Sequence, residues 1–175
     1  MISVVIPAFN EGEGIEACLK SVCDQTLPRD QYEVIVVDGN SKDNTREIAA
    51  KYADKVFIQT SKKVGGARND GVMEAKYDWI VTADADCFFP RTWLETIVND
   101  FKNHPEAATF YGPIYPLEPG LKHKIEVFLY NRVVWLGGKT GIFYATLGAN
   151  TAFRKKELIE AGMYRARDAG HDWEH

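Results

Sequence analysis

Four short apolar runs alternate with helix-like segments, and this alternation limits the folds that the chain can adopt. The runs are rich in β-branched and aromatic residues and cover residues 2–6, 33–37, 56–58 and 79–83. Short, continuous apolar runs of this kind are typical of strands that are buried on both faces of a parallel sheet.

Helical periodicity follows each run. Apolar residues recur at helical spacing within residues 13–24, 45–52, 67–75 and 91–103. Strands that alternate with helices predict βαβ units with right-handed crossovers. We therefore expect a single α/β domain over residues 1–175, in which a Rossmann-like, mostly parallel central sheet is flanked by helices.

The alternation stops after residue 111. Residues 112–120 are rich in Pro and Gly and are expected to form a loop, and residues 137–141 are expected to form a flexible Gly-rich break. The helix-like segment at 122–136 has two interpretations. In the interpretation that we favour, its apolar side packs on the sheet. In the other, the helix lies in a lipid headgroup layer, which its basic and aromatic residues would suit. A last helix is expected over 154–161.

Charge and cysteine content narrow the class of protein. The 175 residues carry a net charge of −4, so the basic footprint of a nucleic-acid-binding protein is missing. Cys18, Cys23 and Cys87 have no CxxC spacing, and the N-terminus shows no secretory signal, which predicts reduced thiols in the cytoplasm. No apolar run reaches the roughly 18 residues that span a bilayer. We expect a cytoplasmic protein, or one at the cytoplasmic face of the membrane.

Polar clusters follow three of the four apolar runs, at residues 7–11, 38–40 and 84–86. In parallel sheets, ligands bind beyond the carboxyl ends of the strands. The three clusters should therefore meet at the edge of the sheet formed by the carboxyl ends of these strands, which we call the rim. Residues 7–11 also fit a plain turn in which Asn10 or Glu11 caps the next helix.

The pair Asp84 and Asp86 lies directly after the fourth run. Carboxylate oxygens are the ligands that Mg²⁺ and Mn²⁺ prefer, and these ions keep positions open for substrate phosphates. Solvated or capping Asp residues are the alternative, since Asp is common in turns. Because other polar clusters share the same rim, the pair predicts a divalent metal site.

The motifs, taken in order, resemble the family 2 glycosyltransferases of GT-A fold. They are VVIPAFNE at 4–11, VVDGNSKDNT at 36–45, GARNDG at 66–71, DAD at 84–86, GANTAFR at 148–154 and GMY at 162–164. The resemblance implies an inverting, metal-assisted transfer of a sugar from a UDP- or GDP-sugar to a hydroxyl of a glycan or lipid-linked acceptor. It also implies that residues 1–111 form the nucleotide-sugar-binding half and residues 112–175 the acceptor-side half.

The same resemblance implies roles for residues of the nucleotide-binding half. Pro7, Phe9 and Glu11 would line the nucleoside pocket, and Asp38 would hydrogen-bond the base. Arg68 would lie near the base or the diphosphate. An ion pair of Arg68 with Asp70 or Glu74 on the same helix remains the alternative.

The resemblance also assigns the acidic residues that take part in the chemistry. Asp84 would contact the ribose or the metal, Asp86 would be the direct metal ligand, and Asp172 would be the catalytic base. An N-cap is the alternative for Asp172. The family usually has Glu-Asp at this motif, whereas this chain has His171 before the Asp, and family members continue beyond the position of His175.

Two other functions use similar residues. A sugar-phosphate nucleotidyltransferase also needs phosphates and a metal, but such enzymes open with a Gly-rich phosphate loop, which residues 7–11 do not form. A non-catalytic nucleotide-sugar-binding module is the second alternative. Residues 65–71 match neither GxGxxG nor GxxxxGK[ST], which argues against a dinucleotide or P-loop site.

Overall fold

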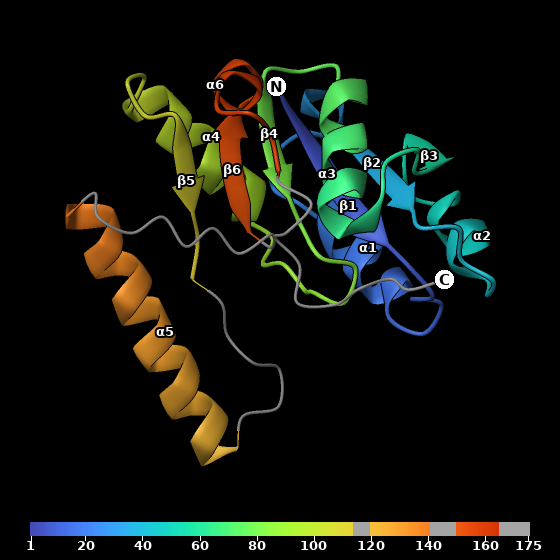
Figure 1. Ribbon diagram of the computed structural model, residues 1–175, viewed down its shortest axis with the longest axis horizontal. Helices are drawn as coiled ribbons and strands as arrows, with labels where there is room; N and C mark the ends of the chain where they lie inside the picture. The colour runs from blue at the N-terminus through green and yellow to red at the C-terminus, as the bar shows by residue number, and fades with distance from the viewer. Residues whose placement is uncertain (114–119, 141–149, 165–175) are drawn as a thin grey trace.

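The computed structural model describes residues 1–113, 120–140 and 150–164. Over these residues the strands form a six-stranded sheet in the order β3-β2-β1-β4-β6-β5 (Figure 1). The strands are β1 (Ile2–Ala8), β2 (Tyr32–Asp38), β3 (Lys55–Ile58), β4 (Trp79–Thr82), β5 (Thr109–Tyr111) and β6 (Thr151–Arg154). The first four are parallel to one another, and β6 is antiparallel to both β4 and β5. The expected mostly parallel α/β sheet is confirmed.

Helices cover both faces of this sheet. They are α1 (Ile15–Cys23), the 3-10 helix η1 (Arg29–Gln31), α2 (Thr45–Ala49), α3 (Lys63–Glu74), α4 (Trp93–Asn103), α5 (Leu121–Thr140) and α6 (Lys155–Glu160). Figure 1 shows α3 in front of the sheet and α1 and α4 behind it. The central strand β1 is buried along its whole length, as its apolar composition predicts.

Successive residues of β1 point into two different cores, because side chains alternate across a strand. Val4 packs into the larger core with Leu19 of α1 and Leu94 of α4. Val5 packs into the smaller core with Val72 of α3. Each amphipathic helix therefore covers one face of the sheet.

One expectation for the later part of the chain is wrong. The Gly-rich stretch is not a break, since α5 continues through Gly137 and Gly138 to Thr140. The expected last helix is confirmed as α6, and it follows β6, a strand that local periodicity does not reveal. Residues 114–119 of the expected loop lie outside the described residues.

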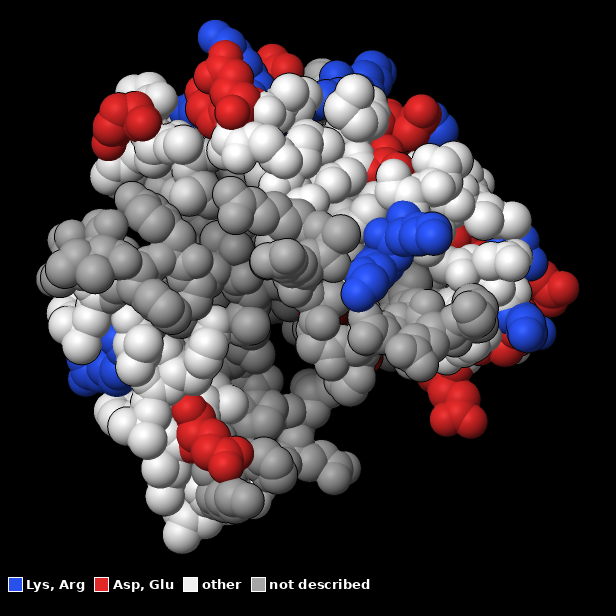
Figure 2. All heavy atoms as spheres, viewed as in Figure 1, with Lys and Arg blue, Asp and Glu red and all other residues white. Residues whose placement is uncertain are grey.

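The favoured packing of α5 on the sheet is also wrong. Ile125, Phe128 and Leu129 are 52%, 58% and 56% exposed. In Figure 1, α5 extends away from the sheet, and the same region of Figure 2 shows mostly uncharged side chains. No helix among the described residues is both long and apolar enough to cross a membrane.

Candidate functional site

The carboxyl ends of β1 and β2 are joined by hydrogen bonds between the loops that follow them. The backbone N–H of Asn10 donates to Ser41 Oγ at 2.9 Å, and the N–H of Glu11 donates to Thr45 Oγ1 at 2.8 Å. In return, Asn10 Oδ1 accepts from the N–H of Lys42 at 3.0 Å. The side chain of Asn10 therefore bridges two loops. The carbonyl of Glu11 accepts from the N–H groups of Gly14 and Ile15 at 3.0 and 2.9 Å, so the expected turn is present. In the described part of the chain, neither Asn10 nor Glu11 caps α1 through its side chain.

Asp38 ends β2 at this rim and is fully buried. Its Oδ2 accepts from the N–H of Ser41 at 3.0 Å and lies 3.3 Å from Nε of Arg46. Its Oδ1 is buried without a hydrogen-bond partner among the described residues. A buried acceptor without a donor is destabilising, so a ligand that brings an N–H to Oδ1 would be bound favourably.

Arg68 lies on α3 and is 6% exposed. Its Nη2 contacts Oδ1 of Asp84 at 2.6 Å, and its guanidinium lies 5.7 Å from the ring centroid of Tyr164. The alternative partners on α3 are engaged elsewhere. Asp70 accepts from Thr60 and Ser61, and Glu74 forms an ion pair with Lys55. The structure therefore contradicts the expected alternative and brings Arg68 to the acidic motif after β4.

Tyr164 connects this ion pair to the last described part of the chain. The side chain of Asn69 binds the backbone of Tyr164 twice, with Nδ2 donating to the carbonyl and Oδ1 accepting from the N–H, both at 2.9 Å. The hydroxyl of Tyr164 lies 3.3 Å from Oγ1 of Thr82 at the end of β4. No role is expected for Tyr164 from the sequence alone, although it lies in the GMY motif.

The acidic residues of the rim create a negative field. Partial burial, together with repulsion from Asp86, Asp43 and Asp84, raises the pKa of Glu11. Asp86 is exposed, and its Oδ1 lies 3.7 Å from the Cys87 thiol. Desolvation, together with the nearby Asp86 and Asp84, raises the pKa of Cys87 to about 12. The thiol of Cys87 is therefore protonated near neutral pH in the metal-free protein.

The fit of this rim to a divalent cation depends on Asp84 and Asp86. The described residues hold no group of three or more His, Cys, Asp or Glu side chains placed to bind a metal ion. Mg²⁺ in phosphate-handling sites is usually bound by one or two carboxylates, and substrate phosphates and water complete its shell. The two Asp residues fit a site of that open kind.

Of the remaining predicted site residues, the structure describes some and not others. Pro7 is buried within β1, and Phe9 is half-buried just after it, so both lie at the rim. Asp172 and His171 lie outside the described residues. Ser41 and Arg46, which orient Asp38, had no assigned role, although Ser41 belongs to the quoted VVDGNSKDNT motif.

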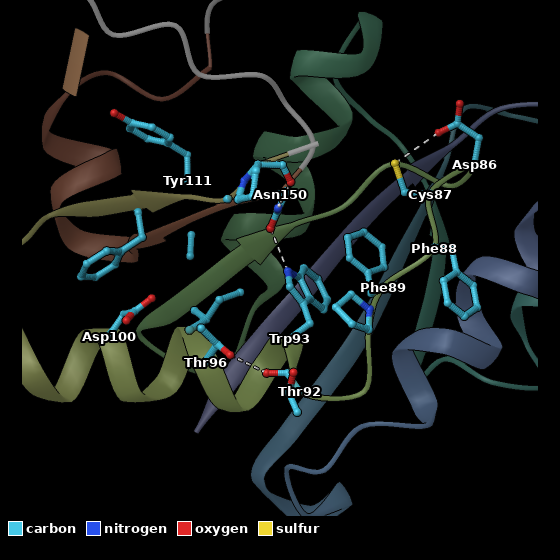
Figure 3. A pocket seen from close by; sticks show the side chains of 16 residues that line it. Asp86, Cys87, Phe88, Phe89, Thr92, Trp93, Thr96, Asp100, Tyr111 and Asn150 are labelled. Carbon is cyan, nitrogen blue, oxygen red and sulfur yellow. Dashed lines mark hydrogen bonds between the residues drawn. The ribbon is translucent and has the colours of Figure 1, made fainter. Parts of the chain in front are cut away.

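A pocket of about 740 Å³ adjoins the rim at Asp86. It lies between α4 on one side and β5 and β6 on the other, and aromatic side chains line it (Figure 3). Trp93 Nε1 donates to Oδ1 of Asn150 at 2.8 Å, and Nδ2 of Asn150 donates to the carbonyl of Pro113 at 3.1 Å. Asn150 therefore links α4 to the chain after β5. The sequence alone does not predict this pocket.

Solved structures share this architecture. The chain superposes on TarS 1-349 from S. aureus in complex with UDP-GlcNAc with a TM-score of 0.72 at 21% identity, covering 93% of this chain and 48% of that one. It superposes on the mannosyltransferase PcManGT from Pyrobaculum calidifontis, in complex with GDP-Man and Mn²⁺, with a TM-score of 0.74 at 25% identity. That match covers 98% of this chain and 49% of the other. The fold is that of the GT-A glycosyltransferases.

Sequence comparison gives the family. The sequence model for glycosyl transferase family 2 matches residues 3–156, so the chain belongs to this family. It is 39% identical over 100 residues to the glycosyltransferase AglE of Haloferax volcanii, covering 54% of this chain and 33% of that protein.

A second relative matches over more of the chain. It is the dolichyl N-acetyl-alpha-D-glucosaminyl phosphate 3-beta-D-2,3-diacetamido-2,3-dideoxy-beta-D-glucuronosyltransferase of Methanococcus voltae, which is 27% identical over 158 residues. The match covers 84% of this chain and 49% of the relative. The chain thus spans less than half the length of both curated relatives.

Proposed function

We propose that this chain catalyses the inverting transfer of a sugar from a UDP- or GDP-sugar to a hydroxyl group of a glycan or lipid-linked acceptor. The observation that carries the proposal is the rim itself. At the rim, the buried Asp38 ends β2 and leaves its Oδ1 without a hydrogen-bond partner among the described residues. The ion pair of Arg68 with Asp84 joins α3 to the chain after β4, and the exposed Asp86 follows two residues later. Relatives that contain UDP-GlcNAc or GDP-Man with Mn²⁺ support the donor class.

The base, the nucleoside and the diphosphate of the donor each have a candidate group at the rim. The free Oδ1 of Asp38 suits a ring N–H of the base, and Pro7, Phe9 and Glu11 would enclose the nucleoside. The guanidinium of Arg68 suits phosphate oxygens, because its planar fork donates two parallel hydrogen bonds. The cation assigned to Asp86 and Asp84, Mg²⁺ or Mn²⁺, would stabilise the negative charge that develops on the diphosphate.

In the proposed reaction, the bond between C1 of the sugar and the β-phosphate oxygen breaks, and its electron pair stays on that oxygen. The acceptor oxygen forms the new bond to C1 from the opposite face, which inverts the configuration. Its proton passes to a general base, for which we propose Asp172 on the basis of the family resemblance. General base catalysis typically contributes about 10²–10⁴-fold to the rate.

Asp86→Ala tests the metal assignment. Because Asp86 is exposed and makes only a weak contact with the Cys87 thiol among the described residues, the variant should keep the thermal stability of the parent. It should lose Mn²⁺-dependent transfer and the Mn²⁺-dependent rise in melting temperature with UDP- or GDP-sugars, since ligands that bind the native state stabilise it.

The matched control for Asp86→Ala is Asp30→Ala, which removes an exposed carboxylate from η1. A fully active Asp86→Ala variant would rule out the assignment. Pyrophosphate release from a nucleoside triphosphate and a sugar phosphate would instead indicate a nucleotidyltransferase. Donor binding without transfer or hydrolysis would indicate a binding module.

We also propose that α5 makes a peripheral contact with the cytoplasmic face of a membrane. Its exposed side carries Ile125, Phe128 and Leu129 together with basic Lys124 and Arg132. The Arg132 guanidinium lies 5.4 Å from the ring centroid of Phe128. Exposed apolar side chains with basic side chains among them suit a surface of anionic headgroups.

Vesicle sedimentation tests this contact. Replacing Phe128 and Leu129 together by Gln should reduce binding to vesicles of phosphatidylcholine and phosphatidylglycerol. Met73→Gln, which changes an exposed apolar side chain on α3, should not. Equal binding of the two variants, or self-association of the chain through α5 without vesicle binding, would contradict the proposal.

A further inference from the structure

The pocket between α4 and the antiparallel strands meets the proposed donor site at one residue. In the sheet order, β2, β1 and β4 carry the rim, and β6 and β5 lie on the far side of β4. Asp86 belongs both to the rim and to the lining of the pocket. A molecule in the pocket would thus approach Asp86 from the side opposite to the nucleotide. Its volume of about 740 Å³ falls in the range of small-molecule sites.

The floor of the pocket consists of flat apolar surfaces. Phe89 and Trp93 stack with ring centroids 3.9 Å apart, and both are almost fully buried. The indole N–H of Trp93 already donates to Asn150, so it is not a free donor to a ligand. Phe88 also lines the pocket and is 62% exposed, so its ring is accessible to a ligand. Such a surface suits the C–H face of a pyranose ring, because apolar and aromatic linings with few polar groups are typical of small-molecule sites.

The charge of the pocket excludes one kind of ligand. Among the described residues that line it, Asp86 and Asp100 are the charged ones, and none is basic. Asp100 lies on α4, and Figure 3 shows its carboxylate directed toward the pocket. An ionised carboxylate only accepts hydrogen bonds. Hydroxyl groups can donate to it, whereas a phosphate or carboxylate on the ligand would be repelled.

We propose that this pocket binds the acceptor as an uncharged glycoside, with a sugar ring against the aromatic lining and a hydroxyl donating to Asp100. The inference rests on the proposed transfer reaction and narrows its acceptor class. Asp100 sets the charge specificity for the acceptor, since its carboxylate repels the carboxylate of an acidic sugar. Like charges placed together at an interface cost several kcal/mol, so discrimination of about tenfold or more is expected.

Calorimetric titration with two probes of equal size tests the proposal. Phenyl β-D-glucoside and phenyl β-D-glucuronide differ only at C6, where the glucuronide carries a carboxylate. Both are titrated into the chain with and without Mn²⁺ and UDP or GDP, and phenyl galactoside and mannoside extend the neutral set. We expect at least one neutral glycoside to bind about tenfold or more tightly than the glucuronide.

Asp100→Asn keeps the shape of the side chain and removes its charge. It should bring the affinity for the glucuronide toward that for the glucoside, whereas the control Asp30→Asn should leave the ratio of the two affinities unchanged. Nucleotide affinity should be the same in all three proteins. Parent protein that binds the glucuronide as tightly as the neutral probes, or that binds none of them, overturns the inference.

The two proposals fail in different ways. If UDP and GDP do not bind but the neutral glycosides do, the proposed donor function fails, and the pocket is a glycoside site that does not serve as an acceptor site. If a nucleotide binds but no neutral glycoside does, the donor function stands and the pocket assignment falls. An Asp100→Asn variant with an unchanged preference would show that Asp100 does not set the charge specificity.

Discussion

Asp70 shows how much one side chain on α3 can organise. Its carboxylate accepts from the N–H groups of Thr60 and Ser61 at 2.5 and 2.9 Å and from their hydroxyls at 3.1 and 2.7 Å. It therefore holds the loop between β3 and α3. Burial acts to raise the pKa of Asp70, but the hydrogen bonds from Ser61 and Thr60 outweigh it and lower the pKa.

Replacing Asp70 by Asn should destabilise the protein by roughly 1–2 kcal/mol near neutral pH, because charge-assisted bonds from two backbone N–H groups are lost or weakened. A lowered pKa in the folded state contributes stability that is present above the ordinary value of 3.8 and is lost as the pH falls through the lowered value. Urea denaturation near neutral pH and in acid measures this. A deficit of the variant that does not shrink in acid would contradict the hydrogen-bonding account.

At the scale of elements, α3 lies unusually close to the sheet. A Cβ added at Gly71 would lie 2.3 Å from Cγ1 of Val5 on β1 and 3.0 Å from Cγ2 of Val37 on β2. The close approach buries Arg68 on the neighbouring turn of α3 and brings it to Asp84. The glycine thus contributes to the geometry of the site through packing.

Gly71→Ala should therefore destabilise the protein by about 1–3 kcal/mol, since overpacking forces both β-branched neighbours to shift. Gly14→Ala is the matched control, because a Cβ there would have its nearest neighbour at 3.8 Å. Chemical denaturation compares the two variants with the parent. A Gly71→Ala variant as stable as Gly14→Ala would show that α3 can move away from the sheet at little cost.

The whole molecule determines the electrostatics of the rim. Glu11 follows β1, Asp43 lies between β2 and α2, and Asp84 and Asp86 follow β4, so these acids meet only when the sheet is formed. The raised pKa of Glu11 means that the folded state binds this proton more tightly than the unfolded chain. The associated stability is fully present below the ordinary value of 4.5 and is lost as the pH rises through the raised value.

Glu11→Gln removes this charge. Without metal, we expect a higher melting temperature for the variant near neutral pH, and the gain should disappear in acid, where Glu11 of the parent is protonated. Mn²⁺ should reduce the gain, because a bound cation relieves the same repulsion. Melting curves in chelator and in Mn²⁺ across this pH range provide the measurement. A variant that is less stable than the parent at neutral pH would contradict repulsion as the cause.

Local sequence patterns predicted much of this architecture. The four apolar runs became β1 to β4, and the helical segments between them became α1 to α4, because strand and helix periodicities report burial along a short stretch of chain. β5 and β6 were not predicted. Both are short antiparallel strands at one edge of the sheet, and β6 is paired with β4 through residues far apart in the sequence, such as Val81 and Ala152.

The amino-acid pattern alone predicts the parallel core and the polar residues at the carboxyl ends of its strands, since both follow from the alternation of elements and the direction of the strands. The folded arrangement sets the partners of these polar residues. It paired Arg68 with Asp84 instead of Asp70, left Oδ1 of Asp38 without a partner among the described residues, and turned the apolar side of α5 away from the sheet. These outcomes depend on how closely elements distant in the sequence approach one another, and a local pattern carries no measure of that distance.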